Sequence, residues 1–158
     1  RSTKPLEGKE KVNLNSIITN YKQSRGKLIS EKSAHIKLSK LPTLSTYKAA
    51  ITQVFHCLID NAIKYSVDGT PPIVEINVTE SKDKWEFSIQ DNGIGIDPKF
   101  HEKVFIIFQR LHNRADYEGT GIGLPIAKKH VELLGGKIWL KSEQGKGATF
   151  YFTIPKTI

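Results

Sequence analysis

The segment ITQVFHCLIDNAIKY (51–65) constrains the fold more than any other part of the chain. Its apolar residues recur at offsets of three and four, so they lie on one face of a helix that packs on a hydrophobic core. They are Ile51, Val54, Phe55, Leu58, Ile59, Ala62 and Ile63. Such a helix needs a second layer to cover that face, so the rest of the chain has to supply one.

Segments with strand character supply that layer, and they come mostly in neighbouring pairs. The strand patterns are HIKLSKL (35–41), IVEINVTE (73–80), WEFSIQD (85–91), KIWLKSE (137–143) and ATFYFTI (148–154). Further helices are predicted over 14–34, from Asp97-Pro98 to residue 108, and from near Pro125 to Gly135. Because strands and helices do not alternate strictly, we predict an α+β fold with a mostly antiparallel sheet covered on one face by helices.

Length and composition narrow the class of protein. The 158 residues suit one domain, and no apolar run approaches the roughly 20 residues of a membrane span. The single cysteine, Cys57, excludes an internal disulfide and a cysteine-based zinc site, as expected in a reducing compartment. The net charge of +8 is spread over scattered lysines and is typical of a solvated surface. Arg1 as first residue and the absence of methionine indicate a fragment of a longer protein.

One flank of the 51–65 helix carries polar groups suited to a nucleotide. Gln53, Cys57, Asn61 and Lys64 fall together at steps of four, four and three. The amide oxygen of Asn61 can coordinate Mg²⁺, and Lys64 can meet phosphate charge. Taken alone, this pattern is better explained by a boundary asparagine and a surface lysine.

Two glycine-rich stretches follow, DNGIGID (91–97) and EGTGIGL (118–124). Asp91 ends a predicted strand, where its carboxylate can accept from an exocyclic amine such as adenine N6. Gly93 and Gly95 allow backbone to lie flat against a ring or to adopt positive φ, although a tight turn needs them too. In the second stretch Gly119, Gly121 and Gly123 precede a helix and Thr120 offers a hydroxyl, so the loop can surround phosphates or act as a hinge.

A polar stretch, QRLHNRADY (109–117), lies between these elements and is interpreted as a lid. Its cationic candidates for phosphate stabilisation are Arg110 and Arg114, together with Lys64 of the helix, and solvated surface charge explains both arginines as well. No residue is assigned as a catalytic acid or base.

The order of the motifs NAIKYS, DNGIGI, FQRLH, GTGIGL and GKGATF resembles the catalytic, ATP-binding domain of two-component sensor histidine kinases, most closely those of phytochrome-like and multi-sensor type. That family shares the Bergerat fold with gyrase B, Hsp90 and MutL. The resemblance covers about residues 11–156. It implies a two-layer α/β sandwich with a mixed five-stranded sheet and three helices, ATP and Mg²⁺ as ligands, and transfer of the γ-phosphate to a histidine.

The resemblance also implies roles for individual residues. Asn61 would hold Mg²⁺, Asp91 would bind the adenine amine, and Phe105 and Phe108 would stand at the root of the lid. Gly145, Gly147 and Thr149 would close the floor of the pocket. The full set implied for nucleotide binding is Asn61, Lys64, Tyr65, Asp91, Gly93, Gly95, Ile96, Phe108, Gly119, Thr120, Gly121, Ile122, Gly123, Leu124 and Thr149.

Two departures and one absence qualify the resemblance. Cys57 stands where many of these kinases carry a first asparagine, and a thiol is a poor Mg²⁺ ligand. Pro125 replaces a smaller residue in the first turn of the following helix, which proline tolerates. None of the five histidines has the sequence context of a phosphoacceptor.

The partner domains are therefore expected elsewhere in the parent protein. Residues 1–10 are interpreted as a linker from a dimerisation domain that carries the histidine, and residues 11–158 as the catalytic domain. The expected partners are that dimerisation domain, in a homodimeric parent, and a downstream response regulator. We expect a cytoplasmic domain without membrane or nucleic-acid contact, whether or not the parent is membrane-bound.

Three alternatives remain. An ATP hydrolase of the gyrase and MutL type carries a glutamate at the position of Cys57, which a neutral thiol does not replace. A non-catalytic ATP-binding interaction module is consistent with Cys57 but not with an intact Asp91 and Asn61. A nucleic-acid binder is consistent with the charge, but the sequence shows no aromatic stacking pattern or recognition helix.

Overall fold

The computed structural model of the chain describes residues 8–106, 123–143 and 145–156. In these residues helices, strands and two short 3₁₀ turns, η1 and η2, follow one another along the chain. The order is β1 (Glu10–Asn13), α1 (Leu14–Ser24), α2 (Gly26–Lys32), β2 (His35–Leu38), β3 (Thr43–Thr46), α3 (Lys48–Lys64), β4 (Ile73–Glu80), β5 (Lys84–Asp91), η1 (Pro98–Phe100), η2 (Lys103–Phe105), α4 (Gly123–Leu133), β6 (Ile138–Ser142) and β7 (Ala148–Pro155).

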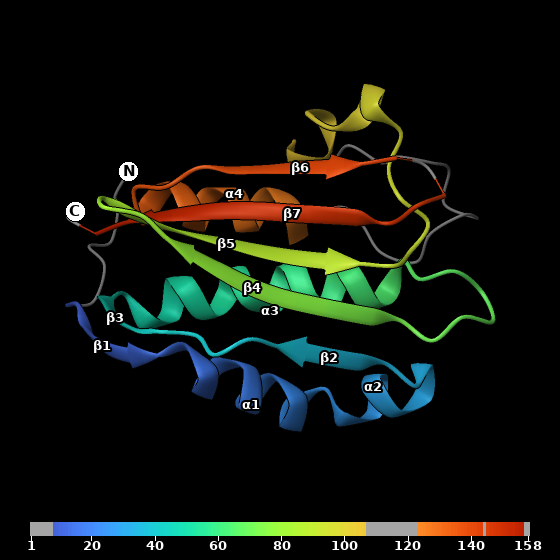
Figure 1. Ribbon diagram of the computed structural model, residues 1–158, viewed down its shortest axis with the longest axis horizontal. Coiled ribbons are helices and arrows are strands. Elements are labelled where there is room, and N and C mark those ends of the chain that lie inside the picture. Colours follow the sequence, from blue (N-terminus) through green and yellow to red (C-terminus); the bar gives the residue numbers. More distant parts are fainter. Residues whose placement is uncertain (1–7, 107–122, 144, 157–158) are drawn as a thin grey trace.

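The main sheet has five strands in the order β2-β4-β5-β7-β6 (Figure 1). β2 runs parallel to β4, whereas the other neighbouring pairs are antiparallel. A separate two-stranded antiparallel pair joins β1 to β3. The prediction of a mixed, mostly antiparallel five-stranded sheet is therefore confirmed.

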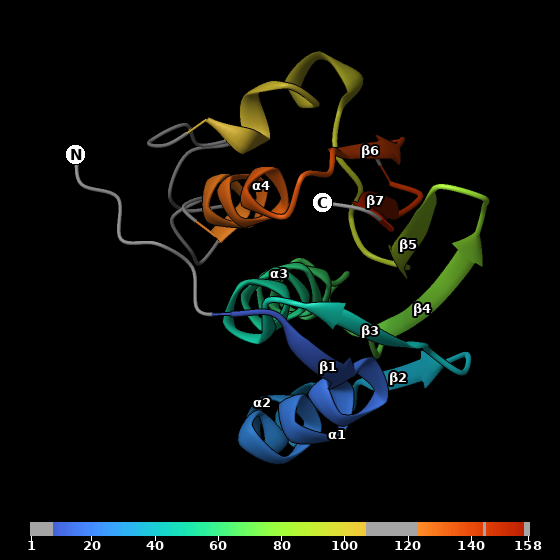
Figure 2. The same cartoon turned by 90° about the vertical axis from the view of Figure 1, so that its left-hand side faces the viewer.

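Helices α3 and α4 lie side by side against one face of the sheet, and α1 lies beyond α3 (Figure 2). Phe55 of α3 meets Phe87 of β5 and Phe152 of β7 edge-on, with ring centroids 5.7 and 5.3 Å apart. All three rings are fully buried. Each such side chain contributes roughly 1.5–3 kcal/mol by leaving water, as an upper estimate. The face of α3 predicted from its periodicity is thus the centre of the core.

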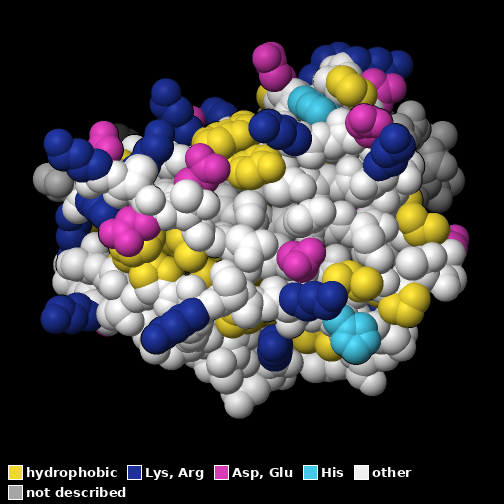
Figure 3. Space-filling view, in the orientation of Figure 1, with side chains coloured by type: hydrophobic (Ala, Val, Ile, Leu, Met, Phe, Trp, Pro, Cys, Tyr) yellow, Lys and Arg dark blue, Asp and Glu magenta, His cyan; other side chains and the backbone are white. Residues whose placement is uncertain are grey.

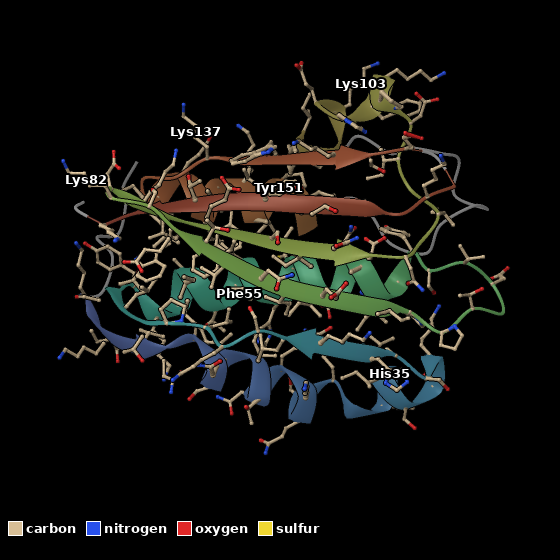
Figure 4. All side chains as sticks on the ribbon, viewed as in Figure 1. His35, Phe55, Lys82, Lys103, Lys137 and Tyr151 are labelled. Carbon is tan, nitrogen blue, oxygen red and sulfur yellow. The ribbon has the colours of Figure 1, made fainter. Side chains whose placement is uncertain are left out.

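The opposite face of the sheet carries no helix from the described parts of the chain. Figure 4 shows Tyr151 on this open face, while Phe55 lies on the helix behind the sheet. Tyr151 stacks on Trp139 of the neighbouring strand with centroids 5.4 Å apart. The middle of the face shows mostly uncharged polar side chains and backbone (Figure 3). The molecule is therefore two-layered, with its core on the helical side alone.

Three features differ from the sequence-based expectations. Strands β1 and β3 were not predicted, and β1 begins at Glu10, the last residue of the stretch interpreted as a linker. The helix predicted over 14–34 is divided at Arg25, which ends α1 and begins α2. The helix predicted from Asp97 is replaced by η1 and η2, although the Asp97 side chain caps the first turn by accepting from the Lys99 N–H.

Within the described ranges, no helix combines the length and the apolar character needed to cross a membrane.

Candidate functional site

The carboxylate of Asp91 stands at the end of β5, as the sequence predicted. Its Oδ1 accepts hydrogen bonds from the backbone N–H groups of Gly93, at 2.8 Å, and Ala148, at 3.1 Å. Within the described residues no cationic side chain pairs with it. Burial raises the pKa of Asp91 to about 6, while the two N–H donors act to lower it. This carboxylate is therefore oriented by the backbone but lacks a neutralising charge.

Two glycines let the backbone close around this carboxylate. A Cβ on Gly93 would overlap the carbonyl oxygen of Tyr65, and a Cβ on Gly147 would overlap the backbone oxygen of Asp91. Gly147 also has φ +83°, a conformation that L side chains rarely adopt. Because only glycine fits, the end of α3, the end of β5 and the β6–β7 turn can approach one another at this point.

Hydrogen bonds fix the loop after Asp91 to its neighbours. The Ile94 N–H donates to the Tyr65 carbonyl at 3.1 Å, and the Ile96 N–H donates to the Ser142 hydroxyl at 2.7 Å. Ser142 in turn donates to the Gly147 carbonyl at 2.8 Å. Gly95 within the loop has φ +76°, and Ile96 is buried. Ser142 is thus part of the site's framework that the sequence did not reveal, because the motif carries no signal for a serine there.

The polar flank of α3 ends beside this loop. Asn61 is half-buried, and within the described residues its amide makes no hydrogen bond, while Lys64 is exposed and forms no ion pair there. Cys57 lies one turn earlier, where its sulfur accepts from Gln53 Nε2 at 3.4 Å. Burial raises the pKa of the Cys57 thiol, which the Gln53 hydrogen bond acts to lower. The predicted flank therefore exists and reaches the same end of the molecule as Asp91.

Helix α4 contributes its first turn. Gly123 is exposed and begins the helix, Leu124 is buried, and Pro125 follows within the first turn. Because α3 and α4 are neighbours, the start of α4 lies on the helical side of the sheet with Asn61 (Figure 2). Phe105 of η2 meets Phe150 of β7 edge-on, at 6.1 Å between centroids. The remaining predicted residues lie outside the described ranges: Phe108, Arg110, Arg114, Gly119, Thr120, Gly121 and Ile122.

Thr149, which was predicted to close the floor of the pocket, lies in β7 directly after Ala148. Side chains alternate along a strand, and Ala148 and Phe150 are buried towards the helices, so Thr149 projects to the open face of the sheet. There it lines a cavity of about 410 Å³ that Asp91, Gly147 and Ala148 also line. The residue of this strand that meets the Asp91 carboxylate is Ala148, through its N–H group.

The donor groups fit a magnesium ion shared with a ligand. Within the described residues, no three histidine, cysteine or acidic side chains gather as a metal site. Mg²⁺ is commonly held by one or two protein oxygens, several waters and substrate phosphates, so the unbonded Asn61 amide is a suitable ligand. A carboxylate, an amide without a hydrogen bond and a helix start are groups of the kind that the base, the metal and the phosphates of an adenine nucleotide require.

Comparison with known proteins agrees with this geometry. Residues 46–158 match the family described as histidine kinase-, DNA gyrase B-, and HSP90-like ATPase. The chain belongs to this family of ATP-binding domains. It is 50% identical over 127 residues to cyanobacterial phytochrome A of Nostoc sp., an alignment that covers 80% of this chain and 16% of that protein. It is 46% identical over 142 residues to the phytochrome-like protein Cph1 of Synechocystis sp., covering 90% of this chain and 18% of the relative.

Solved structures show the same fold. The catalytic domain of the histidine kinase ThkA superimposes with a TM-score of 0.79 at 27% identity, covering 95% of this chain and 97% of that chain. The fold is therefore that of the catalytic domain of histidine kinases. The chain spans less than a fifth of the length of the two phytochrome relatives.

Proposed function

We propose that the chain is the catalytic domain of a sensor histidine kinase and presents ATP to a histidine on a separate dimerisation domain. The observation that carries the proposal is the Asp91 carboxylate, which is held by the Gly93 and Ala148 N–H groups and has no cationic partner in the described residues. A carboxylate kept in this state suits a neutral N–H donor of the ligand, such as the exocyclic amine of adenine.

The chain's own residues act by placement. Asp91 orients the base, the Asn61 amide oxygen is available to a Mg²⁺ ion, and Lys64 offers a positive charge on the same flank of α3. Mg²⁺ would supply neutralisation of the phosphate charge. Phosphoryl transfer requires mainly correct positioning of the reactants and stabilisation of charge. A domain without a catalytic general base of its own can therefore perform it.

The proposal extends to the parent protein. Residues 1–10 would be the linker from the dimerisation domain and residues 11–158 the catalytic domain. The parent would be a homodimer whose phosphohistidine supplies a response regulator, with this domain in the cytoplasm. The phytochrome relatives, which are several times longer than this chain, support a multidomain parent.

A direct test uses the full-length parent with ATP labelled on its γ-phosphate. We expect acid-labile, base-stable label on the protein, as phosphohistidine requires, and loss of that label in an Asn61→Ala variant. The control is Asn77→Ala, since Asn77 is an amide on strand β4 away from α3. Absence of label in the parent, with brisk release of phosphate by the same protein, would favour an ATP hydrolase instead.

A further inference from the structure

A second cavity lies where β1, α1 and the first turns of α3 meet. It measures about 200 Å³, and its floor is apolar, formed by Val12 and Ile17. Both floor residues are buried. Lys48, at the start of α3, lines this cavity, whereas Asn61 of the candidate nucleotide site lies near the end of the same helix. Because a helix rises 1.5 Å per residue, the two positions are about 20 Å apart along α3. The cavity is therefore separate from the site described above.

The polar wall of this cavity consists of hydrogen-bond donors and hydroxyls. Its residues are Lys11, Asn13, Ser16, Asn20, Lys48 and Thr52. The Asn13 oxygen already accepts from the backbone and side-chain nitrogens of Asn15, at 2.9 and 3.0 Å, so Asn13 can offer only its NH₂ group. No carboxylate lines the cavity among the described residues. A wall of this composition favours an anion.

The two lysines of the wall have no counter-charge of their own. Within the described ranges neither Lys11 nor Lys48 forms an ion pair, whereas Lys128 on α4 pairs with Glu132 at 2.8 Å. Unpaired lysines are common on a surface, but here two of them flank one cavity together with neutral donors. The charge of this cavity is therefore open to an external ligand.

The start of α3 adds to the positive potential. Its N-cap residue, Tyr47, makes no side-chain capping bond, and its first turn has no acidic residue. A helix N-terminus carries a partial positive charge. The start of α3 and the two lysines of the wall therefore both favour a negatively charged ligand.

We propose that this cavity binds a small oxyanion of the phosphate class, either inorganic phosphate or the phosphoryl group of a phosphomonoester. A phosphoryl group takes bonds from several donors at once, as the lysine, amide and hydroxyl groups of this wall would provide. The cavity is smaller than the roughly 300–1,000 Å³ typical of sites for drug-sized ligands, which argues against a whole nucleotide. The proposal does not depend on the function proposed for the Asp91 site.

The test is a titration of the ¹⁵N-labelled chain followed by the amide signals of Lys48, Ala49 and Thr52. The probes are inorganic phosphate and phosphoserine, with acetate as a monoanion control. A saturating non-hydrolysable ATP analogue occupies the nucleotide site throughout, so that phosphate binding there does not contribute. We expect saturable shifts with phosphate, with phosphoserine or with both, and which of them binds distinguishes the two sources.

Variants decide whether the cavity is responsible. Lys11→Gln/Lys48→Gln should weaken binding at least about tenfold, because two charge-assisted hydrogen bonds are lost. Lys22→Gln/Lys27→Gln, which removes two exposed charges from α1 and α2, should leave the affinity within about twofold. Thr52→Val tests a single hydroxyl while keeping the side-chain shape. Shifts that grow linearly without saturation, or that weaken equally in both double variants, would refute the site and indicate general attraction to a basic surface.

Discussion

Asp91 and Asp60 are two partly buried carboxylates of the same molecule with opposite surroundings. Asp91 receives only backbone N–H groups, from Gly93 and Ala148. Asp60 accepts from the hydroxyl of Tyr21 at 2.6 Å and from two nitrogens of Arg25 at 3.0 and 3.2 Å. One carboxylate has no counter-charge in the described residues, and the other has a bidentate partner.

The difference distinguishes a structural carboxylate from the one proposed to bind a ligand. Asp60 directly precedes Asn61 in α3, so closeness to the candidate site does not distinguish the two carboxylates. What distinguishes them is charge compensation. Asp60 of α3 forms an ion pair with Arg25, which lies between α1 and α2, so this pair connects the helices. Asp91 has no such partner in the described residues, and its charge is available to a ligand. An uncompensated buried charge costs stability, and this cost is expected at functional positions.

The largest expected effect is the loss of ATP binding in Asp91→Asn. The amide oxygen can still accept from the Gly93 and Ala148 N–H groups, which both donate to Oδ1, but the NH₂ group in place of Oδ2 would face the adenine amine, donor against donor. Losing a charged hydrogen bond and leaving a donor unpaired together amount to about 4 kcal/mol, or about 1,000-fold in Kd. Calorimetry with ATP and Mg²⁺ measures this change, and a variant that binds within about threefold of the natural chain would remove Asp91 from the site.

The next effect concerns the pH dependence of stability. The pKa of Asp91 is raised from 3.8 to about 6 in the fold. Between these values the folded state holds a proton that the unfolded state has lost, so the stability that Asp91 contributes is fully present below pH 4 and is lost as the pH rises through 6. At 1.36 kcal/mol per pKa unit, the contribution lost is about 3 kcal/mol.

Urea unfolding of the natural chain and of Asp91→Asn from pH 4 to pH 7 isolates this contribution, because the other groups titrate alike in both. We expect the natural chain to lose stability relative to the variant as the pH rises. Parallel curves would show that Asp91 ionises normally, and the contrast with Asp60 would then lose its electrostatic basis.

The contrast also shows which features a sequence predicts. Asp91 was found because it ends a strand with clear alternation and begins a glycine-rich motif, both local patterns. The residues that compensate Asp60 lie 35 and 39 positions earlier in the chain, and nothing local in Asp60, Arg25 or Tyr21 indicates that they meet. Long-range polar contacts depend on how α1 packs on α3, which periodicity alone does not fix.

The same limit explains the other differences. β1 and β3 have four residues each, so neither carries a pattern long enough to recognise. They pair with one another although α1, α2 and β2 lie between them in the sequence. The motif GKGATF located the β6–β7 turn but not the strand register, and a shift of one position decides whether Ala148 or Thr149 faces the helices. Motif order predicted the fold and the family, whereas the direction of individual side chains required the structure.

A medium effect is expected for Asp60→Asn, which keeps the shape of the side chain and removes its charge. Breaking a fully buried ion pair costs about 3–5 kcal/mol, but the Arg25 side chain is 37% exposed and solvent compensates part of this loss. We therefore expect the free energy of unfolding, measured in urea, to fall by about 2 kcal/mol, while the Kd for ATP stays within about threefold of that of the natural chain.

The control is Asp68→Asn, since Asp68 is an exposed carboxylate, and this variant should change stability by less than about 0.5 kcal/mol. An Asp60 variant that is stable but fails to bind ATP would contradict the division between the two carboxylates.

The smallest effect is expected for Tyr21→Phe. The ring is fully buried, and its hydroxyl donates to Asp60. Burial raises the pKa of Tyr21, and the hydrogen bond to Asp60 and the charge of Asp60 raise it further. Without the hydroxyl, Asp60 keeps both nitrogens of Arg25, so only part of a charged hydrogen bond is lost and the cost should be about 1 kcal/mol. Tyr151→Phe on the open face of the sheet is the matched control, because that hydroxyl makes no hydrogen bond within the described residues, and its cost should be near zero. Combining Tyr21→Phe with Asp60→Asn should cost less than the sum of the two, since one variant removes and the other weakens the same hydrogen bond. Strict additivity would mean that the hydroxyl and the carboxylate act independently, and that Asp60 is held by Arg25 alone.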